Sequence, residues 1–211
     1  MTTSKNYVAG SLYSACGQRK YLTSAERLRF ISAAMRCPRL EVRTFCLVLA
    51  YTGCRISEAL ALTADSIETH EQFIAVRSLK KRSRKIVIRE LPVPQVCIRL
   101  LRRVHGLDGG VSGRRLWTWS RSRAWQLVKS IMSQASIVKG VHATPKGLRH
   151  GFGLHAIQCG VPLNLVQRWL GHARMETTSI YLQAIGAEER AIASRMWARP
   201  QTRRRTAPAA V

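Results

Sequence analysis

The stretch TPKGLRHGFGLHAIQCGVPLNLVQRWLGHARMETTSIYLQ, residues 144–183, decides the fold of this chain because it holds three short helices separated by clear breaks. Pro145 suits the first turn of a helix, and Gly160 ends the pattern that follows it. Pro162 and Gly171 mark out a second helix in the same way. The third helix covers METTSIYLQ. This spacing predicts a largely helical domain.

Two longer helices are predicted near the N-terminus. YLTSAERLRFISAAMR contains a capping box formed by Thr23 and Glu26, and apolar residues follow it at helical spacing. PRLEVRTFCLVLAYTG is nearly apolar through its middle, which is typical of a buried helix, and Gly53 ends it. RISEALAL then predicts a further helical turn that begins at Arg55.

The middle of the chain changes to strand patterns. EQFIAVRSL and KIVIRELPV are β-branched runs separated by the basic residues KKRSR, which predicts a hairpin. VPQVCIRLLRRVHG and SRSRAWQLVKSIMSQAS are amphipathic and predict two more helices, joined by a Gly-rich loop at 106–113. We therefore expect a mainly α fold with a small antiparallel β-sheet (α+β).

The two ends of the chain lack these patterns. Residues 1–21 have no clear period and are expected to form a loosely held N-terminal arm. Residues 199–211 are rich in Pro and Arg, so we expect a basic, disordered tail. One domain is expected over 22–198, because a chain of 211 residues is long enough for one full hydrophobic core.

The charge balance indicates a polyanionic partner. Thirty-five Lys and Arg against 11 Asp and Glu give a formal net charge of +24. Such a charge destabilises a compact state through self-repulsion unless a polyanion is usually near. Nucleic acid is the leading candidate, because phosphates neutralised by Lys or Arg release condensed counterions. An anionic membrane surface ranks below it, because no basic amphipathic helix lies beside a lipidation signal.

The cysteines and the N-terminus indicate the compartment. The six cysteines are scattered without a C-x-x-C pair, which predicts neither a disulfide framework nor a zinc site. Cys46, Cys54 and Cys159 lie in or beside apolar helical patterns and are expected to behave as small hydrophobes. The start of the chain lacks the apolar region of a signal peptide, and the longest apolar run is too short to span a bilayer. We expect a cytoplasmic, nucleoid-associated protein with no membrane partner.

Tyr181 is a candidate nucleophile within the stretch quoted first. An isolated tyrosine at such a place is usually a core or rim aromatic. Its phenol becomes a nucleophile only where its proton is removed and cations stabilise negative charge. Arg55 and Arg149 could supply those cations, since each lies near a helix start and a glycine, where backbone N–H groups favour an anion. A single arginine in so basic a chain is usually a solvated residue, but two on one phosphodiester would stabilise a pentacoordinate transition state.

Taken together, TGCRISEALAL, the basic hairpin, KGLRHGFG, LGHA and SIYL resemble the tyrosine recombinase (phage integrase) family over about residues 22–198. The gaps from Arg149 to His172 and from His172 to Tyr181 are those that the family keeps. The resemblance implies a site-specific DNA recombinase that breaks and rejoins strands through a covalent 3′-phosphotyrosyl intermediate. Integration, inversion and resolution of DNA all stay open as its outcome.

The resemblance also implies roles for particular residues. Arg55 and Arg149 would hold the scissile phosphate, and His172 would donate a hydrogen bond to a non-bridging oxygen. Tyr181 would be the nucleophile, acting either in its own active site or in a neighbour's. These four residues are the implied centre of the reaction.

The leaving group and the source of energy follow from the same resemblance. The 5′-hydroxyl needs a general acid, and the hairpin lysine of the family falls on Lys80, with Lys81 as the alternative. The sequence has no P-loop and no Cys/His ligand spacing. We expect no cofactor and no metal, because the phosphotyrosyl bond stores the energy of the cleaved phosphodiester.

One position departs from the family pattern. Lys146 stands three residues before Arg149, where the family usually has histidine. Lysine is an accepted variant there and can neutralise phosphate, but it leaves open which group removes the proton of Tyr181. His142 and His150 lie at the wrong offsets from Arg149 to replace the missing histidine, so we assign them to structure or to DNA contact.

The implied partners are double-stranded DNA and further copies of the chain in a DNA-bound tetramer, and an accessory DNA-bending protein is a third partner that the family allows. A predicted helix at 187–197, with Ile192 and Trp197 as anchors, either docks on a neighbouring protomer or packs on its own domain. Because only about twenty residues precede Tyr21, the chain resembles the short members of the family that consist of the catalytic domain.

Two other classes of function are alternatives. A non-catalytic DNA-binding protein could use the same scaffold, but the complete set of implied site residues argues against it. A type IB topoisomerase-like relaxing enzyme would use a similar set, but the short length and the helix predicted after Tyr181 argue against that class. Recombination is the function that the sequence favours.

Overall fold

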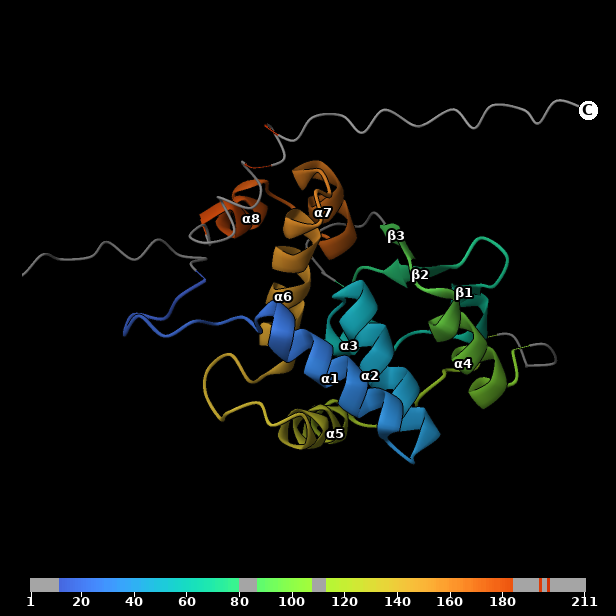
Figure 1. Cartoon of the computed structure of the whole chain (residues 1–211). Coiled ribbons are helices and arrows are strands. Elements are labelled where there is room, and N and C mark those ends of the chain that lie inside the picture. Colours follow the sequence, from blue (N-terminus) through green and yellow to red (C-terminus); the bar gives the residue numbers. More distant parts are fainter. Residues whose placement is uncertain (1–11, 80–86, 108–112, 184–193, 195–196, 198–211) are drawn as a thin grey trace, which may run out of the picture.

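Helices and one small sheet make up the described part of the chain, which in this computed structural model comprises residues 12–79, 87–107, 113–183, 194 and 197 (Figure 1). The predicted α+β class is confirmed. The elements are α1 (Ser24–Arg36), α2 (Leu40–Thr52), α3 (Ile56–Ala59), η1 (Ala64–Ser66), β1 (Ile67–Glu68), β2 (Phe73–Arg77), β3 (Ile88–Pro92), α4 (Gln95–His105), α5 (Arg121–Gln134), α6 (Pro145–Gln158), α7 (Leu163–Leu170), α8 (Glu176–Ser179) and η2 (Ile180–Gln183).

Helix α2 is the central element. It contacts α1, α4, α5 and α6, and its middle residues Phe45 and Val48 are fully buried, as the apolar pattern predicts. Gly53 ends it in the left-handed conformation with φ of 60°. A Cβ at Gly53 would come within 2.5 Å of the Phe152 ring, so only glycine lets this turn pack against α6.

The sheet is antiparallel with strand order β1-β2-β3, and the hairpin of β2 and β3 matches the prediction. Strand β1 was not predicted, because two residues are too few to show a period. Ile74 lies opposite Leu91, and Val76 lies opposite Arg89, and all four side chains are buried. The sheet thus turns one charged residue, Arg89, toward the interior.

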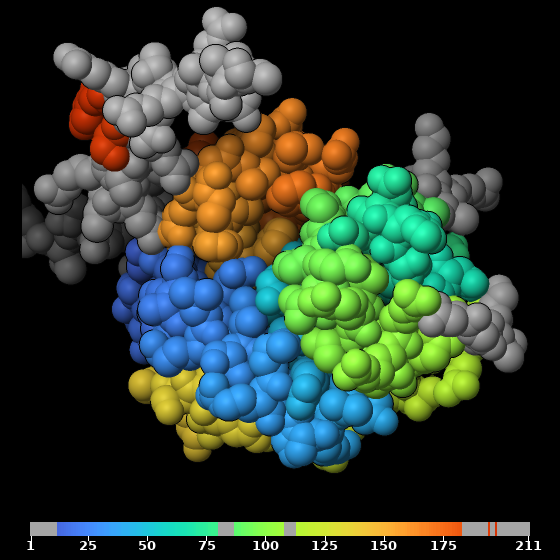
Figure 2. All heavy atoms as spheres, turned by 45° about the vertical axis from the view of Figure 1, so that its right-hand side comes forward, coloured from blue at the N-terminus to red at the C-terminus, as the bar shows by residue number. Residues whose placement is uncertain are grey.

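Two buried clusters hold the elements together. The larger one joins α1, α2, α4, α5 and the inner face of the sheet. The smaller one joins α6, α7 and the η2 turn, and it includes Phe152, Val166, Leu170 and Tyr181. In Figure 2 the sheet and α4 lie to one side of α1. The surface of α6 and α7, in orange, lies above α1 in this view. The candidate nucleophile Tyr181 is therefore part of a core.

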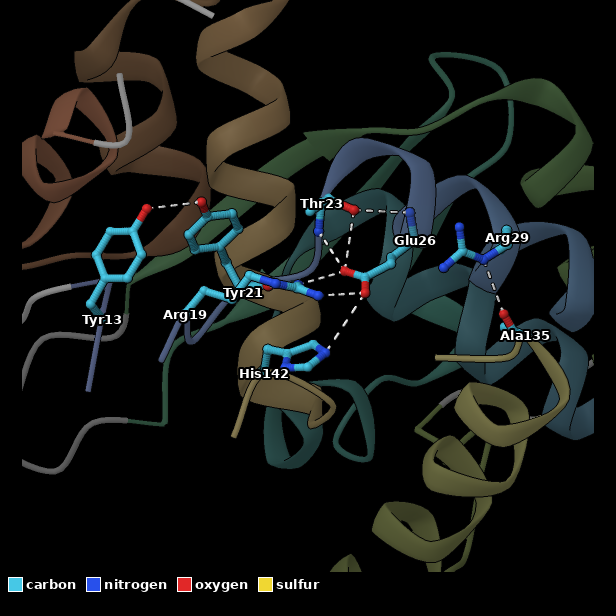
Figure 3. Close-up of polar contacts among 8 residues, drawn as sticks. All are labelled: Tyr13, Arg19, Tyr21, Thr23, Glu26, Arg29, Ala135 and His142. Atoms are coloured by element: carbon cyan, nitrogen blue, oxygen red, sulfur yellow. Dashed lines mark hydrogen bonds and ion pairs between the residues drawn. The ribbon is translucent and has the colours of Figure 1, made fainter. Parts of the chain in front are cut away.

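The N-terminal arm is anchored from residue 12 onward, so the expectation of a loosely held arm is wrong for residues 12–20. Leu12 is buried in the smaller cluster, and Tyr13 forms a β-bridge with Arg19. The Arg19 guanidinium donates two hydrogen bonds of 2.6 Å to the carboxylate of Glu26, which also closes the predicted capping box (Figure 3). Both local and long-range contacts hold this segment, and the periodicity of the sequence does not reveal them.

The cysteines agree with the prediction at two of three positions. Cys46 and Cys54 are buried free thiols, but Cys159 is exposed, because it follows the last residue of α6 and lies outside the core. Within the described residues, no group of three or more His, Cys, Asp or Glu side chains could hold a metal ion. In the same part of the chain, no helix has both the length and the apolar character needed to cross a membrane.

Several predicted features lie outside the described residues. They are Lys80 and Lys81, the hairpin tip, most of the predicted helix at 187–197 with Ile192, and the tail at 199–211. Trp197, the second predicted anchor, is described and its side chain is exposed.

Candidate active site

Arg149 ties three elements together at the centre of the site. It lies on α6, which Thr144 caps by accepting a hydrogen bond from the Gly147 amide at 3.0 Å. Its guanidinium donates to the carbonyl oxygens of Gly53 at 2.8 Å and Leu170 at 2.5 Å. Burial, and next the charge of Arg55, lower its pKa to about 10, so Arg149 is still a cation at neutral pH.

Arg55 is held by a carboxylate that it shares with a second arginine. Its guanidinium donates to Oε1 of Glu58 at 2.8 Å, and Arg89 pairs with Oε2 of the same carboxylate at 2.8 Å. Glu58 and Arg89 are almost fully buried, whereas the Arg55 side chain is 39% exposed. Glu58 therefore fixes Arg55 on one side and leaves it accessible to an anion on the other.

His172 follows α7 and is oriented by the next helix. Its Nδ1 lies 2.9 Å from the Thr178 hydroxyl on α8. Its ring is nearly parallel to the ring of Tyr181, with centroids 6.3 Å apart and an angle of 20°. The contact at Nδ1 fixes the orientation of the His172 ring.

Tyr181 lies on the η2 turn, where the sequence predicts the end of a longer helix. The residue is only 2% exposed, and a Cβ at Gly153 would come within 2.6 Å of the Tyr181 Cζ. Burial raises the pKa of Tyr181 to about 12, although the charges of Arg149 and Arg55 act in the opposite direction. The phenol is thus protonated at neutral pH, and both predicted arginines are near enough for their charges to act on it.

His150 contacts the Tyr181 hydroxyl, with Nδ1 3.2 Å from Oη. From its offset to Arg149 we expected His150 in structure or DNA contact, and its contact with Tyr181 was not predicted. Lys146 lies one helical turn before His150 on α6 and is exposed. His142 lies elsewhere, with Nε2 3.7 Å from the Glu26 carboxylate.

The structure gathers part of the predicted set. Arg149, His172 and Tyr181 lie together, and Arg55 is close enough for its charge to affect the pKa values of Arg149 and Tyr181. Arg89 was missed as the second partner of Glu58. The sequence contained one signal for the burial of Arg89. Arg89 lies two residues before Leu91 on the same strand, so both side chains point to the buried face of the sheet.

The site thus combines two arginines, a histidine and a buried tyrosine within one helical domain. A model described as "Phage integrase family" matches residues 20–187. The chain belongs to the phage integrase family.

Curated relatives agree with this membership. The chain is 33% identical over 141 residues to tyrosine recombinase XerD of Mycobacterium tuberculosis (strain ATCC 25618 / H37Rv), covering 64% of this chain and 45% of that protein. It is 32% identical over 174 residues to a tyrosine recombinase of Thermosipho africanus (strain TCF52B), covering 80% of this chain and 59% of that protein. The chain thus spans about half the length of these relatives.

Solved structures share the fold. The crystal structure of XerA recombinase matches with a TM-score of 0.70 and 27% identity, covering 85% of this chain and 65% of that one. A pre-cleavage complex of XerH site-specific recombinase with its difH substrate matches with a TM-score of 0.67, covering 88% of this chain and 60% of that one. Its identity of 19% supports the fold alone.

Proposed function

We propose that this protein is a site-specific DNA recombinase that cleaves and rejoins strands through a 3′-phosphotyrosyl link to Tyr181. The observation that supports it most is the cluster of Arg149, His172 and Tyr181, with Arg55 near enough to act on the same phenol. Membership of the phage integrase family supports it further. A non-catalytic DNA-binding protein would have no need of a tyrosine held among cations.

In the proposed reaction, the guanidinium groups of Arg55 and Arg149 bind the scissile phosphate. They stabilise the charge that its oxygens gain as the phosphorus becomes pentacoordinate. His172, oriented by Thr178, donates from Nε2 to a non-bridging oxygen. Lys80, outside the described residues, protonates the departing 5′-oxygen.

Tyr181 must become accessible for this reaction. Because only 2% of the residue is exposed, Tyr181 cannot reach a phosphate in the present arrangement. The η2 turn carries Tyr181, and α8 carries the Thr178 partner of His172. We therefore expect these two elements to shift when DNA binds, which links substrate binding to exposure of the nucleophile.

Double-stranded DNA is the proposed substrate. The net charge of +24 suits a polyanion, and similar folds have been solved with DNA, including XerH with difH and the Tn1549 transposon integrase with transposon right end DNA. A DNA-bound tetramer, an accessory DNA-bending protein and location at the nucleoid are further parts of this proposal.

The covalent link can be tested directly. Duplexes that the protein binds are selected from a random pool, nicked near the bound site and incubated with the protein, and adducts are then sought on a denaturing gel. The unsubstituted chain and Tyr13→Phe are expected to form an adduct in the presence of EDTA, and Tyr181→Phe is not. Lack of an adduct from the unsubstituted chain, or an adduct from Tyr181→Phe, would contradict the proposal.

A further inference from the structure

His150 lies within hydrogen-bond distance of the hydroxyl of Tyr181. Nδ1 of His150 lies 3.2 Å from Oη of Tyr181, and the two rings are tilted by 58° with centroids 6.0 Å apart. His150 directly follows Arg149 on α6, so the residue that binds the phosphate also fixes the backbone of His150. The geometry places a nitrogen within hydrogen-bond distance of the atom that must lose a proton.

The surroundings of His150 keep its ring neutral. Burial lowers its pKa to about 4, and the charges of Lys146, Arg149 and Lys20 act in the same direction. A neutral imidazole has one nitrogen without hydrogen. The tautomer with hydrogen on Nε2 leaves Nδ1 free to accept the hydroxyl hydrogen of Tyr181.

Lys146 suits this task less well. Its side chain is exposed on the first turn of α6. In its ammonium form a lysine has three donors and no acceptor, so it can bind a phosphate oxygen but cannot take a proton. The residue that occupies the usual histidine position thus leaves the proton of Tyr181 to another group.

We propose that His150 Nδ1 takes the hydroxyl proton of Tyr181 during strand cleavage, an inference that rests on the function proposed above. As the Oη–P bond forms and the P–O5′ bond breaks, the Oη proton passes to His150, and the 5′-oxygen leaves with a proton from the general acid. In rejoining, the 5′-hydroxyl loses its proton to that same group and attacks phosphorus. The released Tyr181 oxygen recovers its proton from His150.

The two pKa values determine when the proton moves. Because the pKa of Tyr181 is about 12 and that of His150 about 4, a free phenolate does not form before attack. The transfer accompanies formation of the Oη–P bond, which makes the phenolic proton acidic. A phosphate bound beside His150 also favours the imidazolium and raises its pKa, against the effects of Lys20, Lys146 and Arg149.

The test separates proton transfer from positioning. In His150→Asn, an amide oxygen can accept the hydrogen bond but cannot take the proton. We expect cleavage of the nicked duplex in a single turnover to slow by about 100-fold or more. The increase in rate with pH that reflects His150 ionisation in the complex should also disappear. The matched control is His155→Asn, on the same helix, which should cleave at the unsubstituted rate. DNA binding and thermal unfolding check that both variants are folded.

A second measurement tests whether the defect of His150→Asn comes from the loss of proton transfer. Trifluorotyrosine at position 181 has a more acidic phenol and depends less on a base, so it should reduce the defect of His150→Asn by at least tenfold. The inference is overturned if His150→Asn cleaves at the unsubstituted rate with the same pH profile, or if the fluorinated residue leaves the defect unchanged. Absence of any adduct from the unsubstituted chain would instead overturn the proposed function, and this inference with it.

Discussion

The guanidinium of Arg149 donates a hydrogen bond of 2.8 Å to the carbonyl oxygen of Gly53, a residue far away in the sequence. A second bond, to the carbonyl of Leu170, makes Arg149 a clamp between α6, the turn after α2 and the end of α7. The proposed phosphate-binding residue therefore also holds its own site together.

We predict that Arg149→Lys lowers both stability and activity. A lysine keeps the charge but lacks the planar fork that reaches two carbonyls, and it leaves at least one buried acceptor without a partner. The free energy of unfolding in urea should fall by about 2 kcal/mol. Adduct formation should fall by at least 100-fold. Arg55→Lys is the control for stability. Because the Arg55 side chain is part-exposed, this variant should lose less than half as much free energy of unfolding as Arg149→Lys.

The Glu58 carboxylate supports the second arginine. Burial alone would raise its pKa, but the charge of Arg89 and further hydrogen bonds outweigh burial and lower it. Glu58→Gln leaves Arg89 buried without its counter-charge. The free energy of unfolding should therefore fall by about 3 kcal/mol or more. Glu90→Gln, at an exposed position of β3, should change stability by less than about 0.5 kcal/mol. Equal losses in the two variants would show that Glu58 is not the link between the arginines.

The anchored N-terminal segment makes stability depend on pH in a defined window. Hydrogen bonds from Arg19 and Thr23 outweigh burial and lower the pKa of Glu26 from 4.5 to about 2 (Figure 3). A lowered pKa contributes stability that is complete above pH 4.5 and is lost as the pH falls to about 2. Arg19→Gln should therefore cost roughly 1–2 kcal/mol at pH 7, and the difference should shrink below pH 4.5. A difference that stays constant from pH 7 to pH 3 would contradict this assignment.

The basic end of the chain should contribute to DNA affinity. The tail at 199–211 has four arginines. Each phosphate contact that they make adds about 0.9 to the magnitude of the slope of the logarithm of the binding constant against the logarithm of the salt concentration. Removing the whole tail should weaken binding to duplex DNA and lower the magnitude of the slope by as much as about 3.6. Removing only 206–211, which contains no Lys or Arg, should leave the slope unchanged. Fluorescence anisotropy between 50 and 200 mM salt distinguishes these outcomes.

Local patterns predicted most of the fold. The capping box at Thr23, the stop at Gly53 and the helix starts at Pro145 and Pro162 all act within one turn of the chain, so the sequence displays them directly. Residues 12–20 were predicted wrongly because their contacts follow no regular period. Leu12 packs with α6 and α7, which are far away in the sequence, and Arg19 pairs with Glu26 on the next helix.

The site was less predictable than the fold. Spacing and family resemblance selected Arg149, His172 and Tyr181, which the structure places together. They did not select His150, because an offset along the chain from Arg149 says nothing about which way η2 turns the Tyr181 ring. Thr178 and Arg89 were missed for the same reason, since each acts across elements that only the folded chain brings into contact.

The central claim is that Tyr181 itself becomes linked to DNA. The adduct formed on the selected nicked duplex can be digested with nuclease and trypsin and then sequenced by mass spectrometry. Cleavage after Arg174 and Arg190 gives the peptide METTSIYLQAIGAEER, residues 175–190. We predict that this peptide carries a 3′-nucleotide on Tyr181. A 5′-linked nucleotide, or one attached to any other residue, would contradict the account.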